Sequence, residues 1–518
     1  MKRQRTDAAA TATATATAPE EPTPAPTVVS PHLASVNRAA LDFDFERACS
    51  VTLATHNVYA CLVCGRFFAG RAASSPLVKH ALSAGHFVAM SLADGAVYAL
   101  PEGRAVADPS LDDIRFNLRP TYAPADVDAL VPAPGSTSAP AKARFQLDLQ
   151  GARYLPGLVG LNSATGFVNA TLQCLFRVRR LARFFLLRGN WESSPSRVTR
   201  AFGELTCQVW CPKRFKSAAS PHEFLQAVDA ASGGKFKVGA PADAARFLAW
   251  LLDELHYGVG GTRAPGSSVV WRCFQGEVRV DTVVVELKRE FAADRPVVST
   301  AGPAAPRPSP QRDDGGGGGA LLGTATRASV ALTKTEHVPF CFLSLELPTK
   351  PVFTGEMDPT ASVIPRTTLL ELLTKFDGAK EVRETLPGRV ETKRFVVTRL
   401  PETLVLQLKR FTKGRFFVER NRSIVTLPAQ MDMAPCCAPR PASAPYELLA
   451  NVCHEGDASG AADPVAAGVY KANVRYPSAP DDLWFQAHDQ TLRDTMPQLV
   501  AVSDTYLALY ERVAASQQ

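Results

Sequence analysis

Two cysteines and two histidines with metal-binding spacing stand in the N-terminal part of the chain. Two residues separate Cys61 from Cys64, and His80 and His86 follow a short distance along the chain. Two thiolates on one turn and two imidazoles complete the tetrahedral ligand shell that Zn²⁺ prefers. The set contains no carboxylate, so it predicts one structural zinc ion. The open alternative is a pair of buried thiols beside unrelated histidines.

Two further residues of the same segment, Cys49 and His56, are also chemically able to bind a metal. They lack the paired spacing of the other four, so we expect them in the core or at the surface. Cys174 is the cysteine nearest to a glycine-rich loop at 157–166, and it stands in an apolar helical pattern. A thiol in such a place is usually buried, protonated and inert.

A basic segment interleaved with aromatic residues lies in the C-terminal half. Lys409, Arg410, Lys413 and Arg415 surround Phe411 and precede Phe416 and Phe417. Such a segment is able to contact RNA phosphates or an acidic protein surface. The alternative is a solvated hairpin whose aromatic side chains face the core.

Length and composition limit the classes of protein to consider. The chain has 518 residues, 46% of them hydrophobic, and a formal net charge of +7. We find no apolar run near the roughly 18 to 20 residues of a membrane span, and no apolar stretch of a secretory signal near the N-terminus. We therefore expect no membrane association and reduced thiols for the eleven cysteines. The basic run at residues 2–5 is either a nuclear-import signal or a disordered start.

Shifts in composition predict the domain organisation. Residues 1–30 form an Ala/Thr/Pro-rich tail that we expect to be disordered. A first domain covers 31–131, and a Pro/Gly/Ser-rich linker covers 132–153. A second domain runs over 154–513. A Pro/Ala/Gly stretch at about 292–329 interrupts two of its predicted strands and is expected to be a disordered insertion.

Apolar periodicity predicts an α+β protein. A helix is predicted over 167–187, the clearest in the chain, and shorter helices over 223–228 and 243–255. Strand patterns cover 276–287, 337–347, 403–411 and 423–427. The alternation at 41–46 suits either a short strand or an edge-packed segment.

The metal-binding segment resembles a known module. The runs Tyr59–Phe67, Lys79–His80 and Ala84–Val88 are similar to a UBP-type zinc finger. In active members of that family the finger binds the free C-terminal tail of ubiquitin. The resemblance places Arg66 on the tail-binding arginine, with Tyr59 and Tyr98 beside the pocket and Leu100 at a second aromatic position. A structural or protein-binding finger remains the alternative.

The second domain resembles the ubiquitin-specific proteases. Gly160–Gln173 is similar to their cysteine box, where a thiol at a helix N-terminus becomes a nucleophile. The match puts Gly166 at the nucleophile, after a loop about two residues short of the family's spacing. In the histidine box Val469 stands at the general base, and His488, beside Asp489, stands at the third position. The resemblance implies a papain-like fingers–palm–thumb domain without a working triad.

A finger and a vacated triad together characterise one branch of this family, the spliceosomal tri-snRNP-associated protein 2 type. Runs such as Tyr154–Gly160, Ser220–Glu223 and Arg415–Glu419 are similar to it. The branch implies a non-catalytic nuclear scaffold that stabilises the U4/U6.U5 tri-snRNP in pre-mRNA splicing, with its proteins and snRNA as candidate partners. The alternatives are a pseudo-deubiquitinase that binds ubiquitin or a ubiquitin-like protein and, last, a residual deubiquitinase that uses Cys174.

Overall fold

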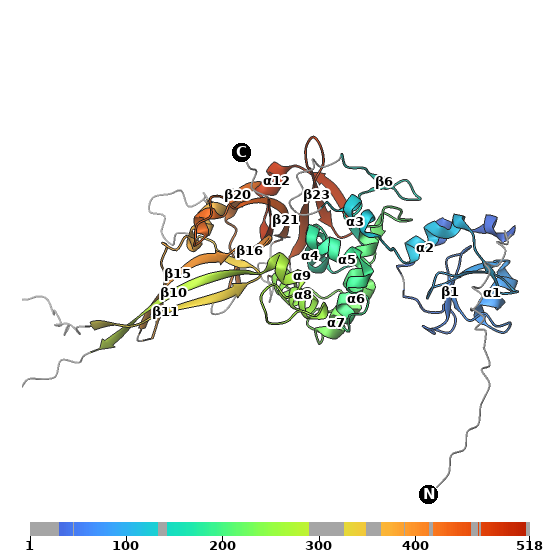
Figure 1. Cartoon of the computed structure of the whole chain (residues 1–518), viewed down its shortest axis with the longest axis horizontal. Helices are drawn as coiled ribbons and strands as arrows, with labels where there is room; N and C mark the ends of the chain where they lie inside the picture. Colours follow the sequence, from blue (N-terminus) through green and yellow to red (C-terminus); the bar gives the residue numbers. More distant parts are fainter. Residues whose placement is uncertain are drawn as a thin grey trace, which may run out of the picture. The chain divides into compact units, whose positions relative to one another are not determined.

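The structure of the chain is a computed structural model (Figure 1). It describes residues 31–44, 46–132, 142–289, 326–348, 364–387, 389–413, 418–456, 465 and 468–513. These residues form two compact units, 31–41 with 47–115 and 42–46 with 116–513. The predicted tail and residues 292–325 of the predicted insertion lie outside the described residues, whereas 326–329 belong to a strand.

The first unit is a small antiparallel sheet with one helix. Its strand order is β2-β1-β3-β4-β5. The elements are β1 (Val58–Cys61), β2 (Phe67–Ala69), α1 (Pro76–Ala84), β3 (Val88–Ser91), β4 (Val97–Ala99) and β5 (Arg104–Val106). Short 3₁₀ turns at Pro31–Ser35, Arg38–Ala40 and Pro109–Leu111 flank the sheet, and α2 (Asp112–Leu118) begins in this unit.

Local sequence explains where α1 begins and ends. The Ser75 side chain accepts a hydrogen bond from the Val78 N–H, and Pro76 occupies the first helical position, where its missing N–H costs nothing. Gly85 ends the helix in the left-handed conformation (φ 71°), which glycine adopts without a steric penalty. The helix buries Leu77, Val78 and Ala81 against the sheet and so fixes the side chains that it carries toward β1.

The second unit combines a helical cluster with a large sheet. Its helices are α3 (Pro124–Leu130), α4 (Gly166–Leu175), α5 (Arg179–Leu186), α6 (Arg197–Val209), α7 (His222–Ala231), α8 (Ala244–Gly258), α9 (Val269–Phe274), α10 (Leu369–Leu373) and α12 (Pro497–Ala501). The helices α4 to α9 share one core with the inner face of the sheet. Among the described residues, no helix combines the length and apolar character needed to cross a membrane.

The large sheet has the order β12-β16-β25-β21-β22-β23-β24, with β20 paired to β21. Its strands are β12 (Leu343–Glu346), β16 (Thr403–Lys409), β20 (Gln430–Asp432), β21 (Pro445–Glu455), β22 (Val469–Tyr476), β23 (Leu483–His488), β24 (Thr491–Thr495) and β25 (Thr505–Arg512). Both faces of β16 are covered, since Val405 joins the helical core while Leu404 and Leu406 join a second cluster. A strand buried on both faces gives the nearly continuous apolar sequence seen here.

A second sheet extends away from the helices and the large sheet (Figure 1). Its order is β11-β10-β15-β14, built from β10 (Gly276–Arg289), β11 (Thr326–Phe340), β14 (Val382–Leu386) and β15 (Arg389–Arg399). Small two-stranded pairings complete the unit: β6 (Gln146–Leu147) with β7 (Arg153–Tyr154), β8 (Gly160–Leu161) with β9 (Ala218–Ala219), β13 (Arg366–Thr368) with β19 (Ile424–Thr426), and β17 (Phe411–Lys413) with β18 (Val418–Arg420).

The α+β class is confirmed, and one local prediction is wrong. The helix predicted over 167–187 is two helices, because the chain turns at Phe176–Val178, where Arg177 and Val178 donate to the carbonyls three residues back. Of the two forms expected for 41–46, a short strand or an edge-packed segment, the strand does not form among the described residues. Asp42 instead pairs with Lys216, and Asp44 accepts from the Ser220 N–H, 3.2 Å away.

The predicted first domain and linker also divide differently in the structure. Residues 116–131, expected with the finger, cluster with the second unit, where Val127 and Val131 enter its core. Residues 133–141 of the linker lie outside the described part of the chain. The rest of the predicted linker, 142–153, forms most of the β6–β7 hairpin on the second unit.

Candidate functional sites

The four predicted metal ligands come from three neighbouring elements of the first unit. Cys61 ends β1, Cys64 lies in the turn that follows, His80 is on α1 and His86 precedes β3. The turn is closed by the Gly65 N–H, which donates to the Cys61 carbonyl oxygen over 2.9 Å. Gly65 has φ 74°, and a Cβ there would lie 1.9 Å from the Ala40 carbonyl oxygen. A glycine is therefore required to bring the second cysteine back toward the first.

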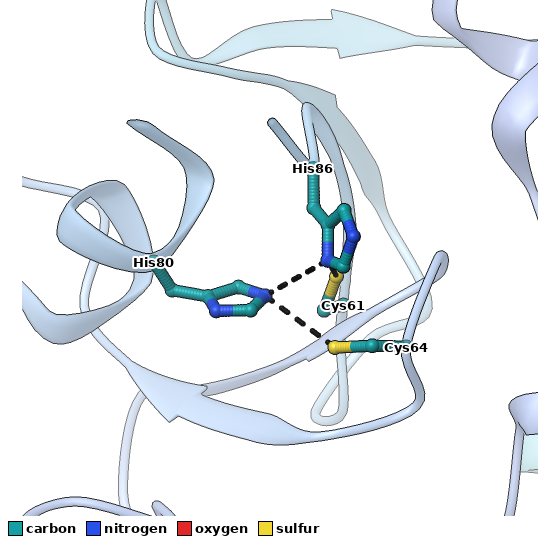
Figure 2. Close-up of side chains that lie close together, drawn as sticks. All are labelled: Cys61, Cys64, His80 and His86. Atoms are coloured by element: carbon teal, nitrogen blue, oxygen red, sulfur yellow. Dashed lines mark hydrogen bonds between the residues drawn. The ribbon is translucent and has the colours of Figure 1, made fainter. Parts of the chain in front are cut away.

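The side chains of these four residues converge on one point (Figure 2). Cys61 Sγ lies 3.6 Å from His86 Nδ1, Cys64 Sγ lies 3.4 Å from His80 Nε2, and the two ring nitrogens are 3.2 Å apart. A tetrahedral zinc with Zn–S near 2.3 Å and Zn–N near 2.0 Å separates sulfur from nitrogen by about 3.5 Å and two nitrogens by about 3.3 Å. The geometry thus fits Zn²⁺ held by two thiolates and two imidazoles.

Surrounding side chains hold the histidines in place. The Phe68 ring stacks on His80 with centroids 4.2 Å apart, and the two imidazoles meet edge-on at 5.1 Å. The spare candidate Cys49 is fully buried outside this cluster, where its Sγ accepts the Thr52 N–H at 3.5 Å. His56 is likewise absent from the ligand group. The metal site is therefore built from the four residues that the spacing singled out.

The structure brings together two of the three residues expected to line a ubiquitin-tail pocket. The Tyr59 and Tyr98 rings meet edge-on with centroids 6.0 Å apart, whereas Arg66 is exposed on the turn after Cys64. A different arginine covers the pair: the Arg71 guanidinium lies 3.8 Å from the Tyr98 ring centroid, and its Nε donates to the Tyr59 hydroxyl over 3.1 Å. The spacing of residues in the sequence does not predict a role for Arg71, because only the folded sheet brings it to the Tyr59 and Tyr98 rings.

The three positions matched to a catalytic triad lie at the ends of three elements of the second unit, among which α4 packs against β22 and β23. Gly166 is the first residue of α4, Val469 begins β22 and His488 ends β23. A Cβ added to Gly166 would lie 3.8 Å from both Asp489 Oδ1 and the Tyr470 carbonyl oxygen. Nothing there clashes, so packing does not require a glycine. Val469 is 44% exposed, and His488 is a surface side chain 3.8 Å from the Asp489 carboxylate.

A hydrogen-bond network missed at the sequence level ties these segments together. Asn169 Nδ2 donates to Asp489 Oδ1 over 2.7 Å and to the Ser163 carbonyl oxygen over 3.0 Å. The Ser163 hydroxyl donates back to Asn169 Oδ1 over 2.8 Å. Asp489 also has a positive φ of 51°, a strained conformation for a non-glycine residue. The position of Asn169 in the cysteine box indicates that it matters. Its partner Asp489 cannot be found in this way, because it lies between β23 and β24, more than 300 residues away.

Replacing Asn169 by alanine is expected to destabilise the second unit by about 2 kcal/mol, because a buried network loses its centre. Urea unfolding followed by tryptophan fluorescence measures this loss. Asn162→Ala is the matched control, since Asn162 is exposed enough for water to replace its contact with Gln490. Equal unfolding midpoints for the two variants would contradict the importance of the network.

Cys174 is not available as a replacement nucleophile. Its side chain is buried within α4, and burial raises the pKa of the thiol, with a further contribution from nearby Cys453. A protonated thiol without access to solvent does not attack a substrate.

The predicted basic segment is only partly a surface. Lys409 is exposed and pairs with Glu346 at 3.5 Å. Arg410 is 0% exposed, and its guanidinium donates to the carbonyl oxygens of Thr505, Asn421 and Ser423. The expected RNA contact at Arg410 is therefore corrected to a structural role, because its donors face the protein interior. The Lys413 side chain and Arg415 lie outside what the structure describes.

Comparison with known proteins agrees with this architecture. A family profile described as "Ubiquitin carboxyl-terminal hydrolase" matches residues 157–510, and one described as "Zn-finger in ubiquitin-hydrolases and other protein" matches residues 49–111. The chain belongs to the ubiquitin carboxyl-terminal hydrolase family. The α4-to-α9 cluster and the large sheet are thus its protease-type domain, and the first unit is its zinc finger.

Relatives and a solved structure cover almost the whole chain. "Ubiquitin carboxyl-terminal hydrolase 39" of Homo sapiens is 32% identical over 93% of this chain and 80% of its own length. "Probable mRNA-splicing protein ubp10" of Schizosaccharomyces pombe is 31% identical over 93% of this chain and 88% of its own. "Crystal structure of an essential yeast splicing factor" has the same fold, with a TM-score of 0.66, 22% identity, and coverage of 93% of this chain and all of that one.

Proposed function

We propose that this chain is a non-catalytic scaffold of the spliceosome that stabilises the U4/U6.U5 tri-snRNP during pre-mRNA splicing. It works in the nucleus, and its partners are tri-snRNP proteins, with snRNA as a further candidate. One structural zinc ion holds its finger. The observation that carries the proposal is an intact protease-type frame whose helix N-terminus, at Gly166, has no side chain to attack with.

Similarity over nearly the full length supports the splicing assignment. The fission yeast relative is named as an mRNA-splicing protein, and its match spans both the finger and the protease-type domain. The match therefore covers both domains of this chain. A scaffold requires a stable core and no nucleophile, and the protease-type domain has an extensive core while Gly166 stands at the nucleophile position.

Affinity purification of the tagged chain from nuclear extract tests the splicing role. Tri-snRNP proteins and the U4, U5 and U6 snRNAs are expected in the eluate at well above background. The variant Cys64→Ser, which removes a metal ligand, shows whether the finger contributes to this recovery. An eluate containing only proteasome or ubiquitin-pathway proteins would refute the tri-snRNP assignment.

The second candidate is a pseudo-deubiquitinase that binds ubiquitin or a ubiquitin-like protein. The Tyr59–Tyr98 pair supports it, since aromatic rings line the tail pocket in the finger family. The Arg71 guanidinium lies against that pair and makes its own contacts there, which argues against a vacant pocket. Calorimetric titration with ubiquitin, and with ubiquitin lacking its last two glycines, separates the two candidates: only a tail-binding finger distinguishes the ligands.

Catalytic inactivity gives a direct prediction. The wild-type chain and Gly166→Cys are both expected to hydrolyse a ubiquitin–fluorophore ester no faster than buffer, because Val469 offers no base for a restored thiol. Loss of a triad member costs an active protease roughly 10⁴- to 10⁶-fold in kcat. A Cβ at Gly166 meets nothing closer than 3.8 Å, and an unchanged urea unfolding midpoint for Gly166→Cys would show that the assay tests chemistry and not folding. Turnover by the wild type that disappears in Cys174→Ala would overturn the non-catalytic assignment.

A further inference from the structure

A narrow hairpin of the second unit carries an unusual combination of side chains. Residues 142–154, here called the hairpin arm, contain β6 and β7 and lie at the margin of their unit (Figure 1). Leu147 is 65% exposed and Leu149 is 48% exposed. Exposed leucines of this size on one short arm leave apolar surface in water that a partner would cover.

The same arm is cationic. Lys142, Arg144 and Arg153 are all exposed, and no ion pair joins any of them to a carboxylate of the described residues. Arg153 lies over the Phe145 ring at 3.9 Å, and Phe145 meets Phe485 of β23 at 6.4 Å. The base of the arm is thereby packed on the sheet. The positive charges of Lys142, Arg144 and Arg153 remain available to a binding partner.

The one acidic residue of the arm faces inward. Asp148 is buried, and its carboxylate accepts the N–H groups of Gln150, Ala152 and Ser217. Burial tends to raise the pKa of Asp148, but those hydrogen bonds outweigh it and lower the pKa. The carboxylate therefore stays charged, and backbone N–H groups already use its oxygens. The arm therefore presents three cations and two leucines to solvent and no exposed carboxylate.

An exposed cation also lies where the arm meets the neighbouring segment around Phe215. The Leu149 N–H donates to the Phe215 carbonyl oxygen over 3.3 Å, which brings the exposed Lys213 close to the arm. The acidic groups of that region are already engaged, since Asp42 pairs with Lys216 and Asp44 lies 3.7 Å from Arg214. The cationic surface thus extends to Lys213 on this side of the arm. On its other side, where the Ala143 N–H donates to the Ser478 hydroxyl oxygen, Asp481 is exposed.

We propose that the hairpin arm is a docking surface for an acidic, apolar segment of another protein: carboxylates pair with Lys142, Arg144 and Arg153 while aliphatic or aromatic side chains cover Leu147 and Leu149. The cations of the arm would attract an acidic partner. The exposed leucines favour a polypeptide, because its apolar side chains can cover them. RNA would engage the cations and leave both leucines in water, so it fits the arm less well. The inference goes beyond the proposed function and does not depend on it.

Binding of labelled probes to the purified full chain tests this surface. The probes are a short fluorescein-labelled peptide alternating Glu or Asp with Leu and Phe, the same peptide with Lys in place of the acids, and labelled oligouridine. Fluorescence anisotropy is expected to show saturable binding of the acidic peptide only. That affinity should fall as salt rises, because exposed ion pairs are screened.

Two double variants separate the apolar from the ionic contribution. Leu147→Ser with Leu149→Ser, and Lys142→Glu with Arg144→Glu, are each expected to weaken peptide binding by about tenfold or more. The control is Leu499→Ser with Arg263→Glu, which alters an exposed leucine and an exposed arginine elsewhere on the unit. Because all these side chains are exposed, unchanged melting temperatures are expected for every variant.

Three results would overturn the proposal. One is the absence of saturable binding of the acidic peptide by the wild-type chain. Another is an equal effect of the control variant and the arm variants. The third is oligouridine binding that the charge-reversal variant abolishes and the leucine variant leaves intact, because that pattern would make the arm an RNA surface.

Discussion

Cys64→Ser is expected to lose its metal and to unfold the zinc-finger unit while the second unit remains folded. Zinc binding by a two-thiolate, two-imidazole site contributes on the order of 10 to 16 kcal/mol at neutral pH, and that free energy is folding free energy when the apo site does not preform. The buried cluster beside the metal contains only eight residues, among them Tyr59, Phe68 and Leu77. Other side chains such as Leu62, Val88 and Met90 are buried elsewhere in the unit, but the core of so small a unit supplies only a few kcal/mol, less than the metal contributes.

Metal analysis and calorimetry measure this outcome together. The wild type should carry one zinc per chain and the variant none, and the variant should lose its finger transition in a thermal scan while keeping that of the second unit. Cys49→Ser is the matched control, because Cys49 is buried in the same unit outside the ligand group. Full zinc content in Cys64→Ser, or its loss in Cys49→Ser, would mean that the ligand set is different.

The sequence was most informative where chemistry depends on short spacing. Cys61 and Cys64 lie on one turn, and α1 carries His80 to the same point, so the pattern within 26 residues already contained the site. Two predicted strands are also confirmed: 276–287 corresponds to β10, and 403–411 corresponds to β16 with β17. Long apolar alternation and continuous apolar runs are reliable signals of a strand.

Contacts between distant segments could not be predicted in this way. Asn169 meets Asp489 across 320 residues, and Arg71 reaches Tyr98 only because β4 pairs with β3, which in turn pairs with β1. The turn that separates α4 from α5 has neither glycine nor proline to announce it. It follows from the burial of Arg177 between the Trp210 and Tyr476 rings, which lie 5.3 and 4.7 Å from its guanidinium.

Burial of a charged residue is the case in which sequence reasoning failed most clearly. The sequence left open whether Lys409 and Arg410 belong to a surface that contacts RNA or an acidic partner, or to a solvated hairpin. Instead β16 ends between the two residues, and Lys409 is exposed while Arg410 is buried. Burial lowers the pKa of Arg410, although nearby Asp504 opposes that shift. The side chain is retained there for its donors, which bond to three carbonyl groups of two separate segments, Thr505 on one and Asn421 and Ser423 on the other.

Arg410→Ala is therefore expected to destabilise the second unit by about 3 to 5 kcal/mol. Removal of the guanidinium takes its donors from the carbonyl oxygens of Thr505, Asn421 and Ser423. The bonds to Thr505 and Ser423 are buried, and each orphaned buried group costs about 1 to 3 kcal/mol. The adjacent Lys409→Ala breaks one exposed pair with Glu346 and should cost less than about 1 kcal/mol.

The two neighbouring variants decide between a structural and an RNA-contacting arginine. Urea unfolding should show a much lower midpoint for Arg410→Ala than for Lys409→Ala at an unchanged slope. Binding of labelled oligouridine is measured on the same samples under conditions in which both variants are folded. If Arg410→Ala kept the wild-type midpoint but lost RNA binding that Lys409→Ala retained, the guanidinium would have to reach solvent. The hydrogen bonds to the three carbonyls would then be dispensable, contrary to the packing of β16 against β25 and the segment after β18.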